Sequence, residues 1–292
     1  MGNSNRPESV DDLQISFNQM TARDLPLETT ARIARETGFE GIGVLPATID
    51  RLGARGVAAV LDAEGLRATS VSAFVGLIDP SPEAQMARMT AAARMLAAAA
   101  ELGVPLVTVV GGPTPLLSPR QAWERALTAM DELLERAEQE GAEVLVEPLH
   151  PVLAGESVAT SVADAQMLIG RSDAGGIVVD TWHVWWDTQL REQVRRAGGR
   201  IRIVHLSDWA AGPGAGLDRV LPGKGISDLP AICADLLDGG FGGWWELEIL
   251  AENLRAEDQV SLIRASYNSA REVLGTALSL AKENGARTES GQ

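Results

Sequence analysis

The segment LLERAEQEGAEVLVE, residues 133–147, holds one complete copy of the pattern that decides the fold. Its first half is amphipathic at helical spacing, because Leu133, Leu134 and Ala137 recur three to four residues apart among charged side chains. Gly141 follows at the point where a helix commonly ends in a left-handed residue. The run after the glycine is short and rich in valine, as in a parallel strand buried on both faces. The segment therefore predicts one helix followed by one strand.

The same order of helix, glycine and apolar run recurs along the chain. Clear copies lie at residues 31–45, 58–74, 97–110 and 235–249, and weaker copies lie at 172–180 and 195–208. The expected helix-ending glycines are Gly38, Gly65, Gly103, Gly141 and Gly240. With the opening segment LQISFN, the predicted strands are about 13–18, 42–46, 67–74, 105–110, 143–147, 177–180, 201–206 and 244–250.

Eight strand-and-helix units in fewer than 300 residues predict an α/β protein with a single (β/α)8 TIM barrel. An open doubly wound sheet is the alternative, and it fits less well because no GxGxxG motif follows the first strand. No linker divides the chain. We expect a catalytic barrel over residues 12–283, a disordered N-terminal tail over 1–11 and a C-terminal tail over 284–292.

The composition is that of a folded protein, with 45% hydrophobic and 22% charged residues. A net charge of −15 argues against a nucleic-acid partner, because such a partner requires basic residues to neutralise its phosphates. The N-terminal segment lacks the apolar stretch of a signal peptide, and the most apolar helix is too short to cross a bilayer. The single cysteine, Cys233, cannot form an internal disulfide. We therefore expect a cytoplasmic protein with no membrane partner.

Metal-ligand side chains follow the last four predicted strands. The strand ends read VLVEPLHP, IVVDTWH, RIVHLSDW and WWELEIL, and the candidates are Glu147, Asp180, His205 and either Glu246 or Glu248. The carboxyl ends of barrel strands converge on one face, so these side chains can meet. Three carboxylates and one imidazole favour Mn²⁺ as the first choice, with Mg²⁺, Co²⁺ or Zn²⁺ as alternatives. The other interpretation is a set of ordinary polar caps on strand ends.

The last strand offers two glutamates that point to the same side, because they are two residues apart. Glu248 lies nearer the carboxyl end and is the expected ligand, whereas Glu246 should lie one layer deeper in a paired or hydrogen-bonded position. Asp208, in the segment HLSD, is expected to orient His205 or the loop that follows it.

In these segments the chain resembles the sugar phosphate isomerase/epimerase superfamily with the xylose isomerase-like barrel. That superfamily includes ketose 3-epimerases, hydroxypyruvate isomerase and inosose dehydratase. The resemblance rests on LVEPLHP, VVDTWH, IVHLSDW, DRVLPGKGISDL and GFGGWWELEIL. It implies a metal bound by Glu147, Asp180, His205 and Glu248, with Glu147 and Glu248 as the catalytic acid and base. It also implies that His183 and Arg219 contact the substrate.

Two further residues of these segments, His150 and Trp182, are candidates for substrate contact. For the tryptophans, packing or a subunit contact is the alternative, so a homo-oligomer is an option. Lys224 departs from the family pattern, which commonly has an acid there. We interpret it as a solvated loop residue, and the alternative is that it meets a different anionic group on the substrate.

The expected function is a metal-dependent isomerase or epimerase of a small sugar, ketose or polyol-derived carbonyl compound. In that reaction a metal stabilises an enediolate while glutamates move the proton. The alternatives are a lyase or dehydratase acting on an inosose-like or 3-keto sugar or glycoside, and a specialised biosynthetic enzyme. An endonuclease is the least favoured, because that class commonly uses more histidines. We expect no nucleotide cofactor.

Overall fold

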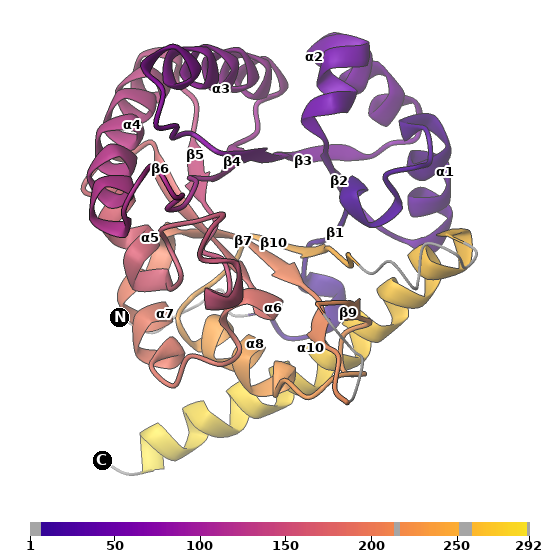
Figure 1. Cartoon of the computed structure of the whole chain (residues 1–292). Coiled ribbons are helices and arrows are strands. Elements are labelled where there is room, and N and C mark those ends of the chain that lie inside the picture. Colours follow the sequence, from indigo (N-terminus) through magenta and orange to yellow (C-terminus); the bar gives the residue numbers. More distant parts are fainter. Residues whose placement is uncertain (1–6, 213–216, 251–258, 291–292) are drawn as a thin grey trace.

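Eight parallel strands close into a barrel in the computed structural model, which describes residues 7–212, 217–250 and 259–290 (Figure 1). Their order around the barrel is β1-β10-β7-β6-β5-β4-β3-β2. The strands are β1 (Ile15–Asn18), β2 (Gly41–Val44), β3 (Arg67–Val75), β4 (Leu106–Val109), β5 (Val144–Val146), β6 (Gly175–Asp180), β7 (Ile201–Leu206) and β10 (Trp244–Leu247). Each predicted apolar run corresponds to one barrel strand, so the predicted (β/α)8 barrel is confirmed.

Helices form a ring outside the strands (Figure 1). They are α1 (Leu27–Thr37), α2 (Pro46–Ala63), α3 (Pro82–Leu102), α4 (Pro119–Glu140), α5 (Val162–Ile169), α7 (Leu190–Ala197), α8 (Leu229–Asp238) and α10 (Gln259–Ser290). The short helix α6 (Thr181–Val184) follows β6 directly at the mouth of the barrel. All five glycines predicted at left-handed helix ends have positive φ, between 65° and 113°. Within the described part of the chain, no helix has the length and apolar composition of a membrane span.

The unit α4–β5 illustrates why the chain folds locally in this way. Ser118 and Gln121 form a reciprocal capping pair at the start of α4, and such a cap contributes about 1 kcal/mol. The helix ends at Gly141, whose φ is 65°. Its buried face includes Leu133 and Leu134, and every residue of β5 is buried. The helix therefore packs against the barrel and delivers the chain directly into the strand.

The barrel interior is divided into an apolar layer and a polar layer. Val107, Leu145, Val178 and Ile203 form a small apolar cluster of their own. Side chains two residues apart on a strand point to the same side. Two residues beyond Leu145, Val178 and Ile203 come Glu147, Asp180 and His205, respectively. The apolar cluster thus lies beneath the polar side chains at the carboxyl ends of the strands.

Regular structure extends past both predicted domain boundaries. The 3-10 turn η1 (Val10–Asp12) lies against α10, where the Arg271 guanidinium is 2.7 Å from the Asp11 carboxylate. At the other end, α10 continues past residue 283 to Ser290. Residues 1–6 and 291–292 of the predicted tails lie outside the described residues. The assignment of residues 12–283 as the catalytic unit stays a prediction.

Candidate metal centre and substrate site

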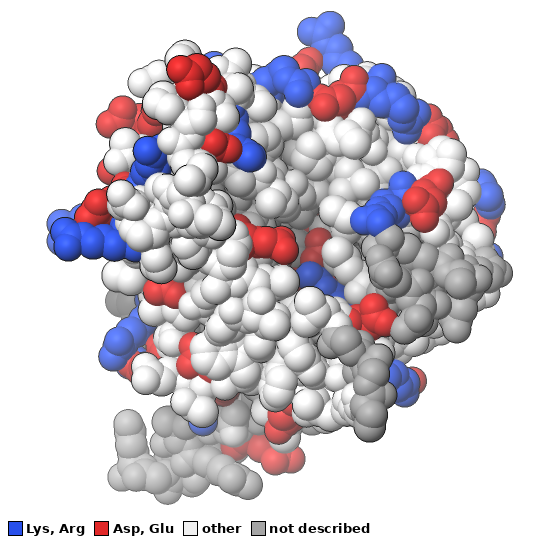
Figure 2. All heavy atoms as spheres, viewed as in Figure 1, with Lys and Arg blue, Asp and Glu red and all other residues white. Residues whose placement is uncertain are grey.

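Four buried side chains from four neighbouring strands meet at the carboxyl end of the barrel. They are Glu147, Asp180, His205 and Glu248, and one ligand atom from each lies within 4.8 Å of the others. These strands, β5, β6, β7 and β10, are consecutive around the barrel. The structure therefore brings together the four residues that the sequence offered as ligands. Figure 2 shows this face hollowed near its centre, with acidic and basic side chains at the bottom of the hollow.

The geometry and chemistry of these side chains fit a divalent cation. Donor atoms that share one such ion lie about 2.0–2.6 Å from it, so they lie within about 5 Å of one another. The four candidate atoms meet that condition. Carboxylate oxygens and one imidazole nitrogen are donors that Mn²⁺, Mg²⁺, Co²⁺ and Zn²⁺ all accept in different proportions.

His205 and Arg219 hold the carboxylates together. Nδ1 of His205 lies 2.8 Å from Oε1 of Glu147 and 3.6 Å from Oε2 of Glu248. Nη1 of Arg219 donates to Oδ2 of Asp180 at 2.8 Å and to Oε2 of Glu248 at 2.7 Å. The second oxygen of Asp180, Oδ1, accepts the backbone N–H of Trp182 and so caps α6. Every carboxylate of the cluster thus has a fixed orientation.

Burial and mutual repulsion shift the pKa values of this cluster. Burial raises the pKa of Asp180 to about 7, and the charges of Glu147 and Glu248 act in the same direction. Burial would lower the pKa of His205, but the carboxylates of Glu248 and Glu147 raise it well above its ordinary value. The pKa of Asp180 is thus raised by burial first and by like charges second, and a bound cation would favour the ionised form of this carboxylate.

His183 lies beside this cluster with one nitrogen already engaged. Nδ1 of His183 accepts the backbone N–H of His150 at 2.9 Å. Its Nε2 lies 3.3 Å from Nη2 of Arg219 and 3.8 Å from Oδ2 of Asp180. Burial, followed by the charge of Arg219, keeps the pKa of His183 well below its ordinary value, so the ring is neutral. Nδ1 accepts a backbone N–H, and Nε2 lies beside a guanidinium that can only donate and beside the Asp180 carboxylate, so the ring joins Arg219 to the cluster.

A short hairpin that the sequence analysis did not predict carries Arg219 to the cluster. It consists of β8 (Asp208–Trp209) and β9 (Arg219–Val220), which pair antiparallel. The Asp208 carboxylate accepts the backbone N–H groups of Gly223, Gly225 and Ser227. Of the two roles expected for Asp208, these contacts are those of a residue that orients the following loop. Lys224, in the same loop, is exposed.

Aromatic rings surround His150 on one side of the site. The rings of Trp182 and Trp209 stack with centroids 4.5 Å apart, and the His150 ring is 4.7 Å from Trp209. The Arg219 guanidinium lies 5.2 Å from the centroid of the Trp182 ring. Trp182 is only 2% exposed, so it supports Arg219 and Trp209 from below, whereas Trp186 is 38% exposed.

Glu246 lies one layer deeper than Glu248, as the alternation along β10 indicates, and it is fully buried. Its carboxylate has four hydrogen-bond donors from β1 and β3 that the sequence analysis missed. These are Ser16, Asn18, Thr69 and Ser70. The only signal for the first two was their polarity at alternate positions of the apolar segment LQISFN. Burial would raise the pKa of Glu246, but His205 and the hydroxyl donors lower it.

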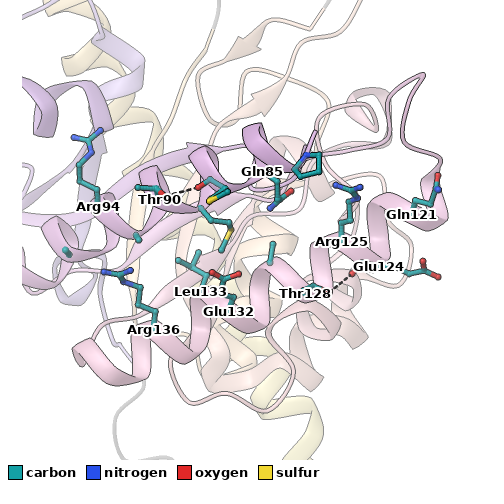
Figure 3. Close-up of a pocket in the computed structure, with 16 residues that line it drawn as sticks. Gln85, Thr90, Arg94, Gln121, Glu124, Arg125, Thr128, Glu132, Leu133 and Arg136 are labelled. Carbon is teal, nitrogen blue, oxygen red and sulfur yellow. Dashed lines mark hydrogen bonds between the residues drawn. The ribbon is translucent and has the colours of Figure 1, made fainter. Parts of the chain in front are cut away.

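A second cavity lies on the outer wall of the barrel, away from these residues. It measures about 860 Å³ and is a groove between α3 and α4 (Figure 3). Apolar side chains such as Met89 and Leu133 lie within it, and Arg94, Arg125 and Arg136 are among its polar residues. None of the candidate site residues lines this groove.

Comparisons with known proteins agree with this architecture. The sequence profile of a protein family described as xylose isomerase-like TIM barrel matches residues 31–283. Among solved structures, the IolI protein with a zinc atom shares 20% identity and a TM-score of 0.77, over 90% of this chain and 98% of that one. No curated protein matches the chain at a significant level.

Two epimerases are also among the structural neighbours. The 3-keto-D-glucoside 4-epimerase YcjR from E. coli shares 20% identity and a TM-score of 0.72, over 89% of this chain and 99% of that one. L-ribulose 3-epimerase shares 22% identity and a TM-score of 0.71, over 94% of this chain and 99% of that one. At these identities the structural likeness shows a common fold.

Proposed function

This chain belongs to the xylose isomerase-like TIM barrel family, and on that basis we propose that it is a divalent-metal-dependent isomerase or epimerase of a small carbohydrate-like carbonyl compound. One observation supports the proposal above all others. Glu147, Asp180, His205 and Glu248 place four donor atoms within 4.8 Å of one another at the catalytic end of the barrel. The family and its sugar epimerases supply the class of substrate.

Glu147, Asp180, His205 and Glu248 are proposed to bind a divalent cation. When bound, a divalent ion supplies Lewis acidity toward the substrate carbonyl oxygen. Mn²⁺ is our first choice because three of the four donors are carboxylates, and the zinc atom of the IolI structure keeps Zn²⁺ as an alternative. The same four residues serve in either case.

Glu147 and Glu248 are proposed to move the proton beside the carbonyl group. They follow β5 and β10, which are separated around the barrel by β6 and β7. Carboxylates from such positions can face a bound sugar from two sides, so one can remove a proton and the other can return it. This arrangement suits an epimerisation, in which the proton returns to the opposite face.

Arg219 and His183 are proposed to orient the substrate oxygens. The Arg219 guanidinium donates to Asp180 and Glu248, and Nε2 of His183 lies 3.3 Å from Nη2 of that guanidinium, so both side chains border the carboxylates. His150 and Trp182 stay candidates for substrate contact, although Trp182 is buried beneath Arg219.

Deuterium exchange tests the proposed reaction. Purified protein with Mn²⁺ would be incubated in heavy water with a panel of 2-keto and 3-keto sugars, and the products analysed by NMR. We expect deuterium at the carbon beside the carbonyl group, together with the epimer or isomer and without loss of water. Loss of water with an unsaturated product would assign a lyase instead. Neither exchange nor elimination, from protein shown to contain Mn²⁺, would contradict the proposal.

Mn²⁺ should stabilise the protein more at pH 8 than at pH 5.5. The pKa values of Asp180 and His205 are raised in the folded protein without a cation. The folded state therefore binds a proton at each of these two groups more tightly than the unfolded state does. Protonation of these two groups therefore stabilises the cation-free fold at low pH, and this stabilisation is lost as the pH rises. For Asp180 the loss occurs between its ordinary pKa and its raised pKa of about 7. A cation must displace the same protons, so low pH opposes its binding.

Melting curves with and without Mn²⁺ measure this effect. A hundredfold excess over the dissociation constant stabilises by about 2.7 kcal/mol, which is an increase in Tm of about 5 °C for a chain of this size. We expect most of that increase to be absent at pH 5.5, with EDTA-treated protein as the reference. Equal increases at the two pH values would contradict the assignment of these groups to the cation site.

A further inference from the structure

Glu246 is a fully buried carboxylate that does not belong to the four-residue cluster. It lies on β10, two residues before Glu248, and its side chain extends toward β1, β2 and β3. Burying a carboxylate is costly unless hydrogen bonds compensate for the lost water. The structure supplies four such bonds, from Ser16, Asn18, Thr69 and Ser70, and they hold this carboxylate in place.

The surroundings of Glu246 form a cradle for one carboxylate. Ser16 donates to Oε2 at 3.1 Å, and Asn18 donates to Oε1 at 2.9 Å. Thr69 and Ser70 of β3 donate from the other side. A Cβ atom on Gly43 would lie 2.3 Å from Oε1, so the carboxylate occupies space that any larger residue at position 43 would fill. Sequence and packing thus fix the carboxylate in one place.

The imidazole of His205 lies between this cradle and the candidate metal centre. Its Nδ1 is 2.8 Å from Oε1 of Glu147, whereas its Nε2 is 3.3 Å from Oε1 of Glu246. Nε2 is buried, and none of its contacts within the described chain has the geometry of a hydrogen bond, so its 3.3 Å approach to Glu246 is an ion-pair contact. A carboxylate surrounded by donors can only accept, so a proton on Nε2 is what makes this contact favourable.

We propose that Glu246 is a positioning residue that keeps a proton on Nε2 of His205, so that Nδ1 is the nitrogen offered to the divalent cation. The inference rests on the proposed function for the identity of the cation site. The contact with Glu246 would explain why His205 offers Nδ1 to the cation and why its ring has one orientation. A carboxylate behind a histidine ligand also makes the ligand nitrogen more basic, and loss of such a partner commonly weakens metal binding 10- to 100-fold.

Two substitutions separate the contact with His205 from the volume of the side chain. Glu246→Met keeps the length of the side chain and removes the acceptor, whereas Glu246→Gln keeps one carbonyl oxygen that Nε2 can still use. The readouts are the dissociation constant for Mn²⁺, from the EPR signal of free Mn²⁺, and the imidazole ¹⁵N spectrum of the Zn²⁺-loaded protein. We expect Glu246→Met to raise the constant by about 10- to 100-fold. Glu246→Gln should restore most of the loss.

The spectrum of the Zn²⁺-loaded wild-type protein should show the His205 proton on Nε2 and none on Nδ1. Ser16→Ala is the matched control, because Ser16 donates to the same carboxylate and has no contact with His205. It should leave the dissociation constant for Mn²⁺ close to that of wild type, because Asn18, Thr69 and Ser70 still hold the carboxylate. Melting curves of all variants report any general loss of structure.

Three results would overturn the inference. They are an unchanged dissociation constant in Glu246→Met, an equal loss in Ser16→Ala, and a wild-type spectrum with the proton on Nδ1. If Glu246→Met did not fold, the ¹⁵N signal of Nε2 in Zn²⁺-loaded Glu246→Gln would decide the question, because a weaker acceptor should move that signal and an unchanged signal would contradict the inference. Failure of the proposed function has a different signature, namely that the wild-type protein itself binds no Mn²⁺ or exchanges no deuterium.

Discussion

Replacement of Glu147 by glutamine should lower the rate of deuterium exchange into the substrate by about 10²- to 10⁴-fold, the usual contribution of a general base. Glutamine has nearly the same shape but cannot accept the proton. Glu147 is the proposed base because it follows β5 at the mouth of the barrel, with Oε1 fixed 2.8 Å from His205. The measurement belongs at saturating Mn²⁺, because the substitution also removes a proposed ligand.

Glu143→Gln is the matched control for this experiment. Glu143 precedes β5, at the opposite end of the strand from Glu147, and pairs with Arg202 at 2.9 Å. Half-exposed ion pairs of this kind contribute little, so the exchange rate should stay within about twofold of wild type. An exchange rate for Glu147→Gln within tenfold of wild type, at full Mn²⁺ occupancy, would remove Glu147 from the proposed acid-base pair.

His205→Ala should raise the dissociation constant for Mn²⁺ by more than about a hundredfold. Loss of a residue that only supports a ligand costs about 10- to 100-fold, and loss of the ligand itself should cost more. The substitution also removes the group that links the carboxylates of Glu147 and Glu246. Equilibrium dialysis with metal analysis measures the effect directly, and the melting curve of the cation-free variant shows whether it folds.

His150→Ala provides the comparison with the same residue type. The His150 ring contacts tryptophan rings at the mouth of the barrel, and His150 does not belong to the four-residue cluster. Mn²⁺ binding should therefore be unchanged, whereas the Michaelis constant for a substrate should rise if His150 contacts it. Retention of one tightly bound Mn²⁺ per chain in His205→Ala would show that His205 is not a ligand.

The sequence predicts the barrel well because the fold has a local repeat. Each helix, glycine and apolar run can be recognised within about 15 residues, as in residues 133–147, and the carboxyl ends of such strands converge by topology. The same logic predicts that Glu147, Asp180 and His205 come together, because each lies at or just past the carboxyl end of its own strand. The choice of Glu248 over Glu246 follows from the two-residue period of β10.

The contacts of Arg219 could not be predicted from local pattern. Its hairpin strands, β8 and β9, are two residues each and leave no periodic signal. The partners of its guanidinium, Asp180 and Glu248, are 39 and 29 residues away in sequence. The resemblance to known enzymes implied a contact with substrate, and the structure adds that Arg219 binds two of the candidate ligands.

The cradle of Glu246 is a second feature that local pattern does not reveal. Ser16 and Asn18 are visibly polar within β1, but their partner lies about 230 residues further along the chain. The pairing becomes visible only once β1 and β10 are adjacent in the barrel. Trp182 is similar, because its stacking on Trp209 depends on the position of the hairpin.

A crystal structure of the wild-type protein grown with Mn²⁺, with anomalous diffraction used to locate the ion, would show whether the four residues bind a metal. We predict one strong anomalous peak, coordinated by Glu147, Asp180, Nδ1 of His205 and Glu248, with contacts of about 2.0–2.6 Å. The absence of a peak among these residues at saturating Mn²⁺, or a single peak elsewhere on the chain, would contradict the account.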